Sequence, residues 1–200
     1  MRTGSGSLIV VRHAQPIVDP ERSPIEWDLA PEGVAAARLL AASIPPTRDV
    51  LVIASPEPKA MATAQEIATL RNVPVVTDVR LREQGVEEIP FLEERAFRSA
   101  VMRHFQQPEE PIFGGESAEQ AASRFAGAVA HAIAQARGER VPILVSHGRI
   151  LSSWLTRVGQ PLRPAEEIWL SLRMPDAFLV DLEVGAVERI ELGDAIVEGE

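Results

Sequence analysis

The sequence has 200 residues and contains neither cysteine nor tyrosine. Without cysteine there can be no disulfide bond, thiol nucleophile or thiolate metal ligand, and such a chain suits a reducing compartment. Without tyrosine, no phenol is available for acid–base chemistry. The apolar run at residues 8–11 is too short for a signal peptide or a membrane span. We therefore expect a soluble protein in the cytoplasm.

Positively charged residues are also scarce. Lys and Arg number 20 against 29 Asp and Glu, which gives a formal net charge of −9 at pH 7. Nucleic acids and anionic lipid surfaces attract dense positive charge, so this balance argues against general affinity for either. We therefore expect neither nucleic acid nor membrane as a partner. Any cationic site in this chain must be a local pocket within an acidic surface.

Apolar residues make up 46% of the chain, enough for the core of a single domain over residues 1–200, with a polar and flexible N-terminus at 1–7. Four short runs rich in β-branched residues are apolar at both alternating positions, as strands buried on two faces require. These runs are residues 8–12, 50–54, 74–79 and 141–146. Segments with helical periodicity, such as 57–71 and 118–137, separate them. This alternation predicts an α/β fold with central parallel strands.

Two long irregular regions that contain several prolines, at 14–30 and 80–116, interrupt the alternation. Long segments of this kind in a compact domain are often lids or binding loops, and the second contains a helix near residues 93–106. Towards the C-terminus, the apolar segments 177–183 and 187–192 flank a glycine turn and predict a hairpin. We expect the two irregular regions to shape a binding pocket.

Two of the four histidines occupy matching positions. His13 directly follows the first predicted strand, and His147 directly follows the last of the four. The carboxyl ends of parallel strands lie along one edge of a sheet, so both imidazoles can face the same crevice. Ala14 and Gly148 come next, and these small residues allow the backbone to approach a ligand closely. A lone histidine would fit a structural cap at a strand end, but the pair favours a functional site.

Cationic groups gather at the same predicted edge. Arg12 precedes His13, and the strand at 50–54 runs into a helix whose first turn carries Lys59. The N-terminus of a helix offers free N–H groups and the positive end of the helix dipole, both of which suit an anion. A plain surface lysine would be unfavourable at that end, which favours a role for Lys59. Two imidazoles, a guanidinium, an ammonium and a helix start together indicate a site for a phosphoryl group.

The order of these motifs resembles that of the histidine phosphatase superfamily, the phosphoglycerate-mutase-like proteins. The matching segments are Arg12-His13, the block from Ser55 to Ala64 with Lys59, Glu83 within Leu81-Arg82-Glu83, and Ser146-His147-Gly148. Each motif alone is weak, but four in order at strand ends are specific. The similarity extends from about residue 8 to residue 183. It implies a three-layer α/β/α fold in which helices cover both faces of a mostly parallel central sheet.

The resemblance also implies a role for each matching residue. His13 would be the nucleophile that becomes phosphorylated, which requires a neutral imidazole with one ring nitrogen held protonated by an acceptor. Arg12, Lys59 and His147 would hold the phosphoryl oxygens and neutralise their charge. Gly148 would join this phosphate-binding set, because glycine lets its backbone come close to the phosphoryl group. Glu83 would give a proton to the leaving oxygen, which predicts a raised pKa for its carboxyl group. No cofactor is implied.

The chain departs from the family pattern at two of these positions. Ala14 stands where the family has glycine, which is tolerable if the φ angle is negative. Lys59 stands where the family generally has arginine, and an ammonium is a point charge whereas a guanidinium grips two oxygens in one plane. Either turnover is slower or another arginine takes over that role. The candidates are Arg22, Arg82 and especially Arg149, which follows His147-Gly148.

The remaining chemical candidates are weaker. Glu87 and Glu88 lie in the same predicted loop as Glu83, which only the motif match distinguishes from them. His104 and His131 occur in polar stretches of predicted helix, and we expect both to be solvated. The sequence has no His-x-His, no His-Glu-x-x-His and no cysteine, so no metal site is predicted.

The leading hypothesis is therefore a cofactor-independent phosphatase that hydrolyses a small phosphorylated metabolite, a phosphomonoester, through a phosphohistidine at His13. A phosphoglycerate-type mutase would use the same phosphohistidine but return the phosphoryl group to a bound sugar acid. A non-catalytic binder of phosphorylated ligands is the third alternative, and Lys59 and Ala14 motivate it. The sequence identifies neither the leaving group of the substrate nor the oligomeric state.

Overall fold

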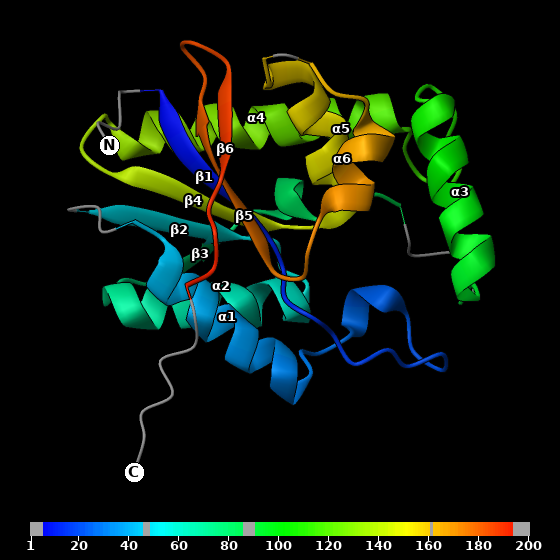
Figure 1. The fold of residues 1–200 in the computed structure, drawn as a ribbon, viewed down its shortest axis with the longest axis horizontal. Helices are drawn as coiled ribbons and strands as arrows, with labels where there is room; N and C mark the ends of the chain where they lie inside the picture. Colours follow the sequence, from blue (N-terminus) through cyan, green and yellow to red (C-terminus); the bar gives the residue numbers. More distant parts are fainter. Residues whose placement is uncertain (1–5, 46–48, 86–90, 161, 194–200) are drawn as a thin grey trace.

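Six strands form one sheet in the order β3-β2-β4-β1-β5-β6 (Figure 1). The computed structural model describes residues 6–45, 49–85, 91–160 and 162–193. The strands are β1 (Ser7–Arg12), β2 (Val50–Ala54), β3 (Val75–Thr77), β4 (Val141–Ser146), β5 (Asp176–Asp181) and β6 (Ala186–Arg189). β3, β2, β4 and β1 are parallel, β5 is antiparallel to β1, and β6 is antiparallel to β5.

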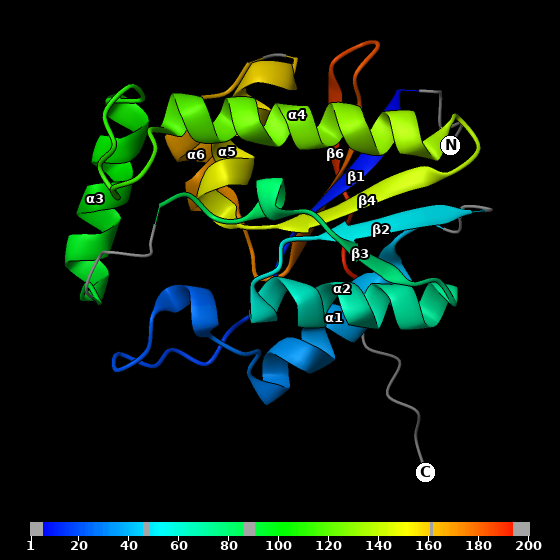
Figure 2. The ribbon, with the colours of Figure 1, turned by 180° about the vertical axis from the view of Figure 1, so that it is seen from behind.

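Helices cover both faces of this sheet (Figures 1 and 2). The α-helices are α1 (Pro31–Ser43), α2 (Pro58–Arg71), α3 (Glu94–Gln106), α4 (Ala118–Ala136), α5 (Gly148–Val158) and α6 (Ala165–Ser171). Two short 3-10 helices are η1 (Pro24–Glu26) and η2 (Val79–Leu81). α1 and α2 lie on one face, whereas α4 and α5 lie on the other (Figure 2). The predicted three-layer α/β/α fold with a mostly parallel sheet is confirmed.

The core consists of two apolar layers because the strands are apolar at both alternating positions. Leu8 and Val10 of β1 pack in the layer with α4 and α5. Ile9 and Val11 pack in the opposite layer with α1 and α2. All four side chains are buried, and full burial of such a side chain stabilises the fold by about 1.5–3 kcal/mol. β1 is therefore firmly anchored, which fixes the position of whatever follows it at its carboxyl end.

The runs predicted at 8–12, 50–54 and 141–146 correspond to β1, β2 and β4, whereas the run at 74–79 is only partly a strand. β3 ends early because the Asp78 side chain accepts a hydrogen bond from the Arg80 N–H and caps η2. The predicted C-terminal hairpin is present as β5 and β6.

Sequence reasoning misses α5 and α6. The available signal for α5 was its amphipathic spacing, which places Arg149, Ser152 and Ser153 on one side of the helix and apolar residues on the other. α6 has only seven residues, which is short for a pattern to emerge.

Some of the predicted features fall outside the described residues. In the N-terminal segment 1–7, residues 1–5 are not described, and Ser7 already belongs to β1. Glu87 and Glu88 also lie outside the described residues. Within the described ranges, no helix combines the length and apolarity needed to cross a membrane.

Candidate active site

His13 and His147 lie at the carboxyl ends of the neighbouring strands β1 and β4. In the register of this parallel pair, Arg12 is opposite Ser146, so the two histidines leave the sheet side by side. Their ring centroids are 5.1 Å apart, and the rings meet edge to face at 63°. Both side chains are buried. The structure thus brings the two imidazoles into one site, as the strand topology predicts.

The His13 ring is oriented by a backbone carbonyl. Nδ1 lies 2.7 Å from the carbonyl oxygen of Ala14. Because a carbonyl oxygen can only accept, Nδ1 carries the hydrogen and Nε2 keeps its lone pair. Burial holds the pKa of His13 well below its ordinary range, and the nearby His147 and Lys59 act in the same direction. His13 is therefore neutral at pH 7, with one ring nitrogen free for nucleophilic attack.

Ala14 fits its position without strain. The residues other than glycine with positive φ angles in the described chain are Asn72 and Arg137, so Ala14 does not need the conformation reserved for glycine. Its backbone N–H donates to the Thr63 hydroxyl at 3.0 Å. The added methyl group is therefore tolerated, as the sequence leads us to expect.

His147 is held by two groups from the segment that follows β2. Its Nε2 lies 2.8 Å from Ser55 Oγ and 3.2 Å from Glu57 Oε1. Burial lowers the pKa of His147 to about 3, although the carboxylate of Glu83 opposes this shift. The ring is therefore neutral, and the nearby Glu57 carboxylate favours the tautomer that carries its hydrogen on Nε2. Within the described residues, Nδ1 has no hydrogen-bond partner.

Arg12 leaves part of its hydrogen-bonding capacity unused. Its Nη1 donates to the Leu172 carbonyl oxygen at 3.2 Å, whereas Nε is buried and has no partner among the described residues. The guanidinium lies against the backbone of Gly148, where a Cβ atom would come within 3.1 Å of Nε. A larger residue at position 148 would push the guanidinium away. Gly148 therefore keeps Arg12 at the site by permitting this close approach.

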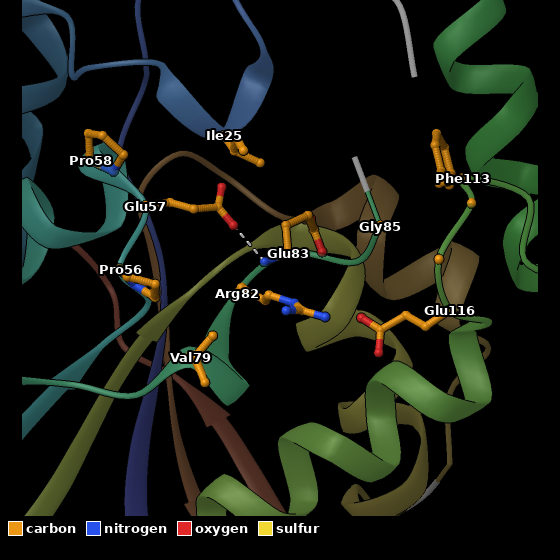
Figure 3. A pocket seen from close by; sticks show the side chains of 12 residues that line it. Ile25, Pro56, Glu57, Pro58, Val79, Arg82, Glu83, Gly85, Phe113 and Glu116 are labelled. Carbon is orange, nitrogen blue, oxygen red and sulfur yellow. Dashed lines mark hydrogen bonds between the residues drawn. The ribbon is translucent and has the colours of Figure 1, made fainter. Parts of the chain in front are cut away.

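Lys59 is also buried at the site, but its charge is already paired. Its Nζ donates to Glu57 Oε2 at 2.6 Å and to the Pro24 carbonyl oxygen at 2.6 Å. The other carboxylate oxygen of Glu57 accepts from the backbone N–H of Glu83 at 2.7 Å (Figure 3). Glu57 occupies the N-cap of α2, where a carboxylate interacts favourably with the helix dipole. The ammonium that we assign to phosphate therefore has a carboxylate beside it.

Sequence reasoning misses Glu57. It is one of the two unspecified positions between Pro56 and Lys59 in the motif block, so the motif match says nothing about it. The available signal was an acidic residue at the predicted start of a helix, two residues before Lys59. A lysine is unfavourable at that end of a helix, so a neighbouring carboxylate was a natural partner for it.

Glu83 receives hydrogen bonds from backbone N–H groups on both carboxylate oxygens. Oε1 accepts from Gln84 at 3.0 Å and from Ile150 at 3.1 Å, and Oε2 accepts from Arg149 at 3.1 Å. Burial raises the pKa of Glu83, but Arg149, His147 and these N–H groups outweigh it and lower the pKa to about 2. The expectation of a raised pKa is wrong for the free protein, in which Glu83 is ionised.

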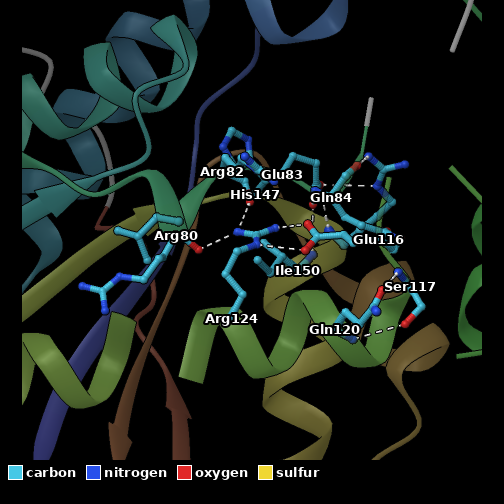
Figure 4. Close-up of polar contacts among 12 residues, drawn as sticks. Arg80, Arg82, Glu83, Gln84, Glu116, Ser117, Gln120, Arg124, His147 and Ile150 are labelled. Carbon is cyan, nitrogen blue, oxygen red and sulfur yellow. Dashed lines mark hydrogen bonds and ion pairs between the residues drawn. The ribbon is translucent and has the colours of Figure 1, made fainter. Parts of the chain in front are cut away.

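The segment that carries Glu83 is fixed by Arg124 of α4 (Figure 4). Arg124 Nη1 donates to the carbonyl oxygens of Arg80 at 2.6 Å and Arg82 at 3.1 Å. The same guanidinium pairs with the carboxylate of Glu116. Because these contacts hold the backbone on both sides of residue 81, they position Glu83 without touching its carboxylate.

Of the three arginines that could stand in for the family's guanidinium, only Arg149 lies beside the histidines. It is buried, its Nε is 3.5 Å from Glu83 Oε2, and its Nη2 donates to the Gln84 carbonyl oxygen at 3.0 Å. Arg82 lines a neighbouring smaller cavity. Arg22 lies at the surface, 3.4 Å from Asp28.

A cavity of about 690 Å³ opens over these groups. Its lining includes the site residues Arg12, His13, Glu57, Lys59, Glu83, His147, Gly148 and Arg149. Both irregular regions contribute to its walls, as the sequence predicts, and the segment around α6 contributes as well. Glu57 and Glu83 also line a second cavity of about 380 Å³ (Figure 3). No group of three or more potential metal-ligating side chains occurs within the described ranges.

His104 is buried, and the expectation that it is solvated is wrong. Its ring packs against Phe113 at 5.7 Å and Phe105 at 5.0 Å between centroids, and both ring nitrogens lack partners in the described chain. Burial and the charge of Arg149 lower its pKa to about 4. The spacing of Phe97, Val101 and His104 along α3 was the available signal for a buried face. His131 is exposed, as expected.

Replacing His104 with leucine is expected to raise the free energy of unfolding by about 1–2 kcal/mol at pH 7, because two unpaired buried nitrogens disappear. The difference in the free energy of unfolding between the variant and the wild type should grow as the pH falls. The pKa is about 4 in the folded state and near 6.5 in the unfolded state, so the unfolded chain binds an extra proton between these values. The folded wild type thus loses stability as the pH falls from about 6.5 to about 4.

Urea denaturation at pH 7 and pH 4.5 measures this difference. The exposed His131→Leu variant is the matched control and should not show the gain at pH 7. A His104→Leu variant whose advantage stays constant over this interval would contradict the buried, neutral state of His104.

The fold and the site together define an α/β protein with a pocket lined by histidines and cationic side chains at the carboxyl ends of its parallel strands. The chain belongs to the histidine phosphatase superfamily (branch 1), whose family model matches residues 8–184. The family resemblance of the sequence motifs is thereby confirmed.

Solved structures share this fold at low sequence identity. A mycobacterial glucosyl-3-phosphoglycerate phosphatase, solved with inorganic phosphate, superimposes with a TM-score of 0.70 at 20% identity, covering 92% of this chain and 93% of its own. A phosphoglycerate mutase from Bacillus anthracis gives 0.69 at 14% identity, covering 94% of each chain. The Bacillus stearothermophilus protein YhfR gives 0.68 at 22% identity, covering 94% of this chain and 97% of its own. No curated protein sequence matches the chain.

Proposed function

We propose that this protein is a phosphatase that hydrolyses a small phosphomonoester through a phosphohistidine at His13. The observation that carries the proposal is the state of the His13 ring. Its Nδ1 hydrogen is bound to the Ala14 carbonyl oxygen, and burial keeps the ring neutral. Nε2 therefore offers a lone pair at the carboxyl end of β1, beside the cations that a phosphoryl group requires.

In the first step, His13 Nε2 attacks phosphorus, an N–P bond forms and the P–O bond to the leaving alcohol breaks. Charge spreads over the phosphoryl oxygens during this transfer. Arg12 and Lys59 supply positive charge, and the free donor at Arg12 Nε can contact one of these oxygens. Since Lys59 is buried and Arg12 is half-buried, both already in place, little reorganisation is needed as charge develops.

The leaving oxygen must gain a proton, and Glu83 is ionised in the free protein. A phosphomonoester has a second pKa near 6, so part of the substrate arrives as a protonated monoanion at neutral pH. The complex of a monoanionic substrate with ionised Glu83 has the same total number of protons as the complex of a dianionic substrate with protonated Glu83. The substrate can therefore deliver the proton that Glu83 passes to the leaving oxygen.

In the second step, water attacks the phosphorus of phospho-His13. The Glu83 carboxylate accepts a proton from that water, the N–P bond breaks, and His13 returns to its neutral form with inorganic phosphate as the product. Neutral His13 is a good leaving group because its environment already disfavours the charged ring. The same carboxylate thus serves first as acid and then as base.

Trapping the phosphoenzyme tests this proposal. The purified protein is mixed with an aryl phosphate, quenched in alkali, which preserves phosphohistidine, and analysed by mass spectrometry. A gain of one phosphoryl group on the peptide that contains His13 is expected, followed by its loss as free phosphate. With 3-phosphoglycerate and a trace of bisphosphoglycerate, isomer formation that outpaces phosphate release would instead identify a mutase. Binding of phosphate with neither labelling nor turnover across a substrate panel would identify a binder.

A further inference from the structure

The walls of the larger cavity also contain many large apolar side chains. They come from three separate segments of the chain: the loop after β1, α3, and the segment from α6 to β5. We name six of them the apolar wall: Val18, Trp27, Phe97, Trp169, Leu170 and Met174. The chain has only three Trp and six Phe and no Tyr, yet two of these Trp line this one cavity.

Several members of the apolar wall are left in contact with water. Leu170 is 59% exposed, Val18 is 51% exposed and Met174 is 37% exposed. Single exposed apolar residues are normal on a protein surface, but a group of them around one cavity indicates a binding surface. Because burying them against an apolar ligand removes them from water, such a ligand gains binding free energy here.

The charges around the apolar wall do not favour a second anionic group on the ligand. Beyond Arg12, Lys59 and Arg149, the cationic residue among the described lining is Arg98. Its Nε lies 3.1 Å from Glu94 Oε1, and both side chains are exposed on α3. The carboxylate of a sugar acid would therefore meet an arginine that already has a partner, next to a carboxylate that repels it.

The cavity is also much larger than a phosphoryl group needs. Its volume of about 690 Å³ lies in the range that encloses most of a drug-sized molecule. The phosphoryl group would occupy the end near His13 and His147, which leaves the space beside the apolar wall for the alcohol part of the ester.

We infer that the substrates are phosphate monoesters of apolar alcohols, with an aromatic ring or a chain of several carbons, rather than esters of polyols or sugar acids. This inference rests on the proposed function and names its substrate class. The phosphoryl group is held by the cationic end of the cavity, and the apolar wall selects the leaving group by burying it.

A series of primary alkyl phosphates tests the inference, because the acidity of the leaving alcohol barely changes along it. Ethyl, butyl, hexyl and 2-phenylethyl phosphate are compared with glycerol 3-phosphate and 3-phosphoglycerate. The value of kcat/KM is expected to rise about two- to fourfold per added methylene, as burial of a methylene predicts. Glycerol 3-phosphate and 3-phosphoglycerate should remain at or below ethyl phosphate. A flat series, or one led by 3-phosphoglycerate, would overturn the inference.

Two leucines of equal exposure provide matched variants. Leu170 and Leu162 are both 59% exposed, but only Leu170 lines the cavity. Leu170→Ser should lower the ratio of kcat/KM for hexyl over ethyl phosphate about three- to tenfold, whereas Leu162→Ser should leave it unchanged. Since both side chains are exposed, neither change threatens folding. Equal ratios in the two variants would count against the apolar wall.

Alkylphosphonates, which cannot be hydrolysed, separate this inference from the proposed function. Calorimetry is expected to show that hexylphosphonate binds at least tenfold more tightly than ethylphosphonate. If no ester is turned over but the phosphonates keep this order, the phosphatase proposal fails and the apolar ligand class stands. If the esters are hydrolysed while phosphonate affinity is independent of chain length, the inference fails and the phosphatase proposal stands.

Discussion

Replacing His13 with alanine is expected to reduce kcat/KM for an aryl phosphate by about 10⁴-fold or more. Alanine removes the nitrogen that forms the covalent bond to phosphorus, and no cysteine or tyrosine exists to replace it. His147 is close, but its ring carries the hydrogen on Nε2 and points that nitrogen at Ser55 and Glu57. To occupy the place of the His13 ring, the His147 ring would have to break both contacts. Steady-state assays on the purified variant measure the loss.

The matched control is His131→Ala, which removes an exposed imidazole from α4 and should keep wild-type activity. Circular dichroism and thermal unfolding of the His13→Ala variant establish that the fold is intact. Activity within tenfold of wild type in a folded His13→Ala variant would exclude the phosphohistidine mechanism.

The paired histidines were predictable because the rules that place them act on short stretches of sequence. A β-branched run that is apolar at both alternating positions predicts a strand buried on two faces, and parallel strands end at one edge of the sheet. His13 and His147 directly follow such runs, so no long-range contact had to be known to bring them together. The layers of the fold follow from the same pattern, since both faces of each strand need covering helices.

The charge state of Glu83 was not predictable in this way. Its carboxylate accepts hydrogen bonds from the backbone N–H groups of Arg149 and Ile150, which are 66 and 67 residues away in the sequence. Those groups are available because α5 begins immediately after β4, and the motif Ser146-His147-Gly148 does not by itself mark a helix start. A motif match places the residue in the site, but it cannot report which helix points its free N–H groups at the carboxylate.

His104 and Glu57 were misjudged for a related reason. Arg103 makes the surroundings of His104 look polar, yet the tertiary contact with Phe113 decides that this face of α3 is buried. Glu57 is an ordinary acidic residue at a helix start until the fold places it against Lys59 and His147. In both cases a partner lies on another element, so periodicity can indicate a buried face or a helix start but cannot identify the contact that decides the role.

Replacing Glu57 with glutamine is expected to tighten the binding of inorganic phosphate and of vanadate about 10- to 100-fold. Glu57 contacts Lys59 at 2.6 Å and His147 at 3.2 Å, so its negative charge lies among the groups that would surround a bound dianion. At an effective dielectric constant of about 20, a unit charge roughly 5 Å from a dianion costs several kcal/mol before other groups compensate. The expected net gain is smaller, because the surrounding cations already compensate part of this repulsion.

Glutamine is the informative replacement because it removes the charge and keeps the shape. Its amide oxygen can still accept the N–H of Glu83, and Lys59 becomes free to turn from residue 57 towards the anion. Calorimetry with phosphate and inhibition by vanadate give the affinities. Glu94→Gln is the control, since that carboxylate also lines the cavity but is exposed and already paired with Arg98, so its effect should stay within about twofold. Weaker phosphate binding by Glu57→Gln would show instead that Glu57 holds Lys59 in its working position.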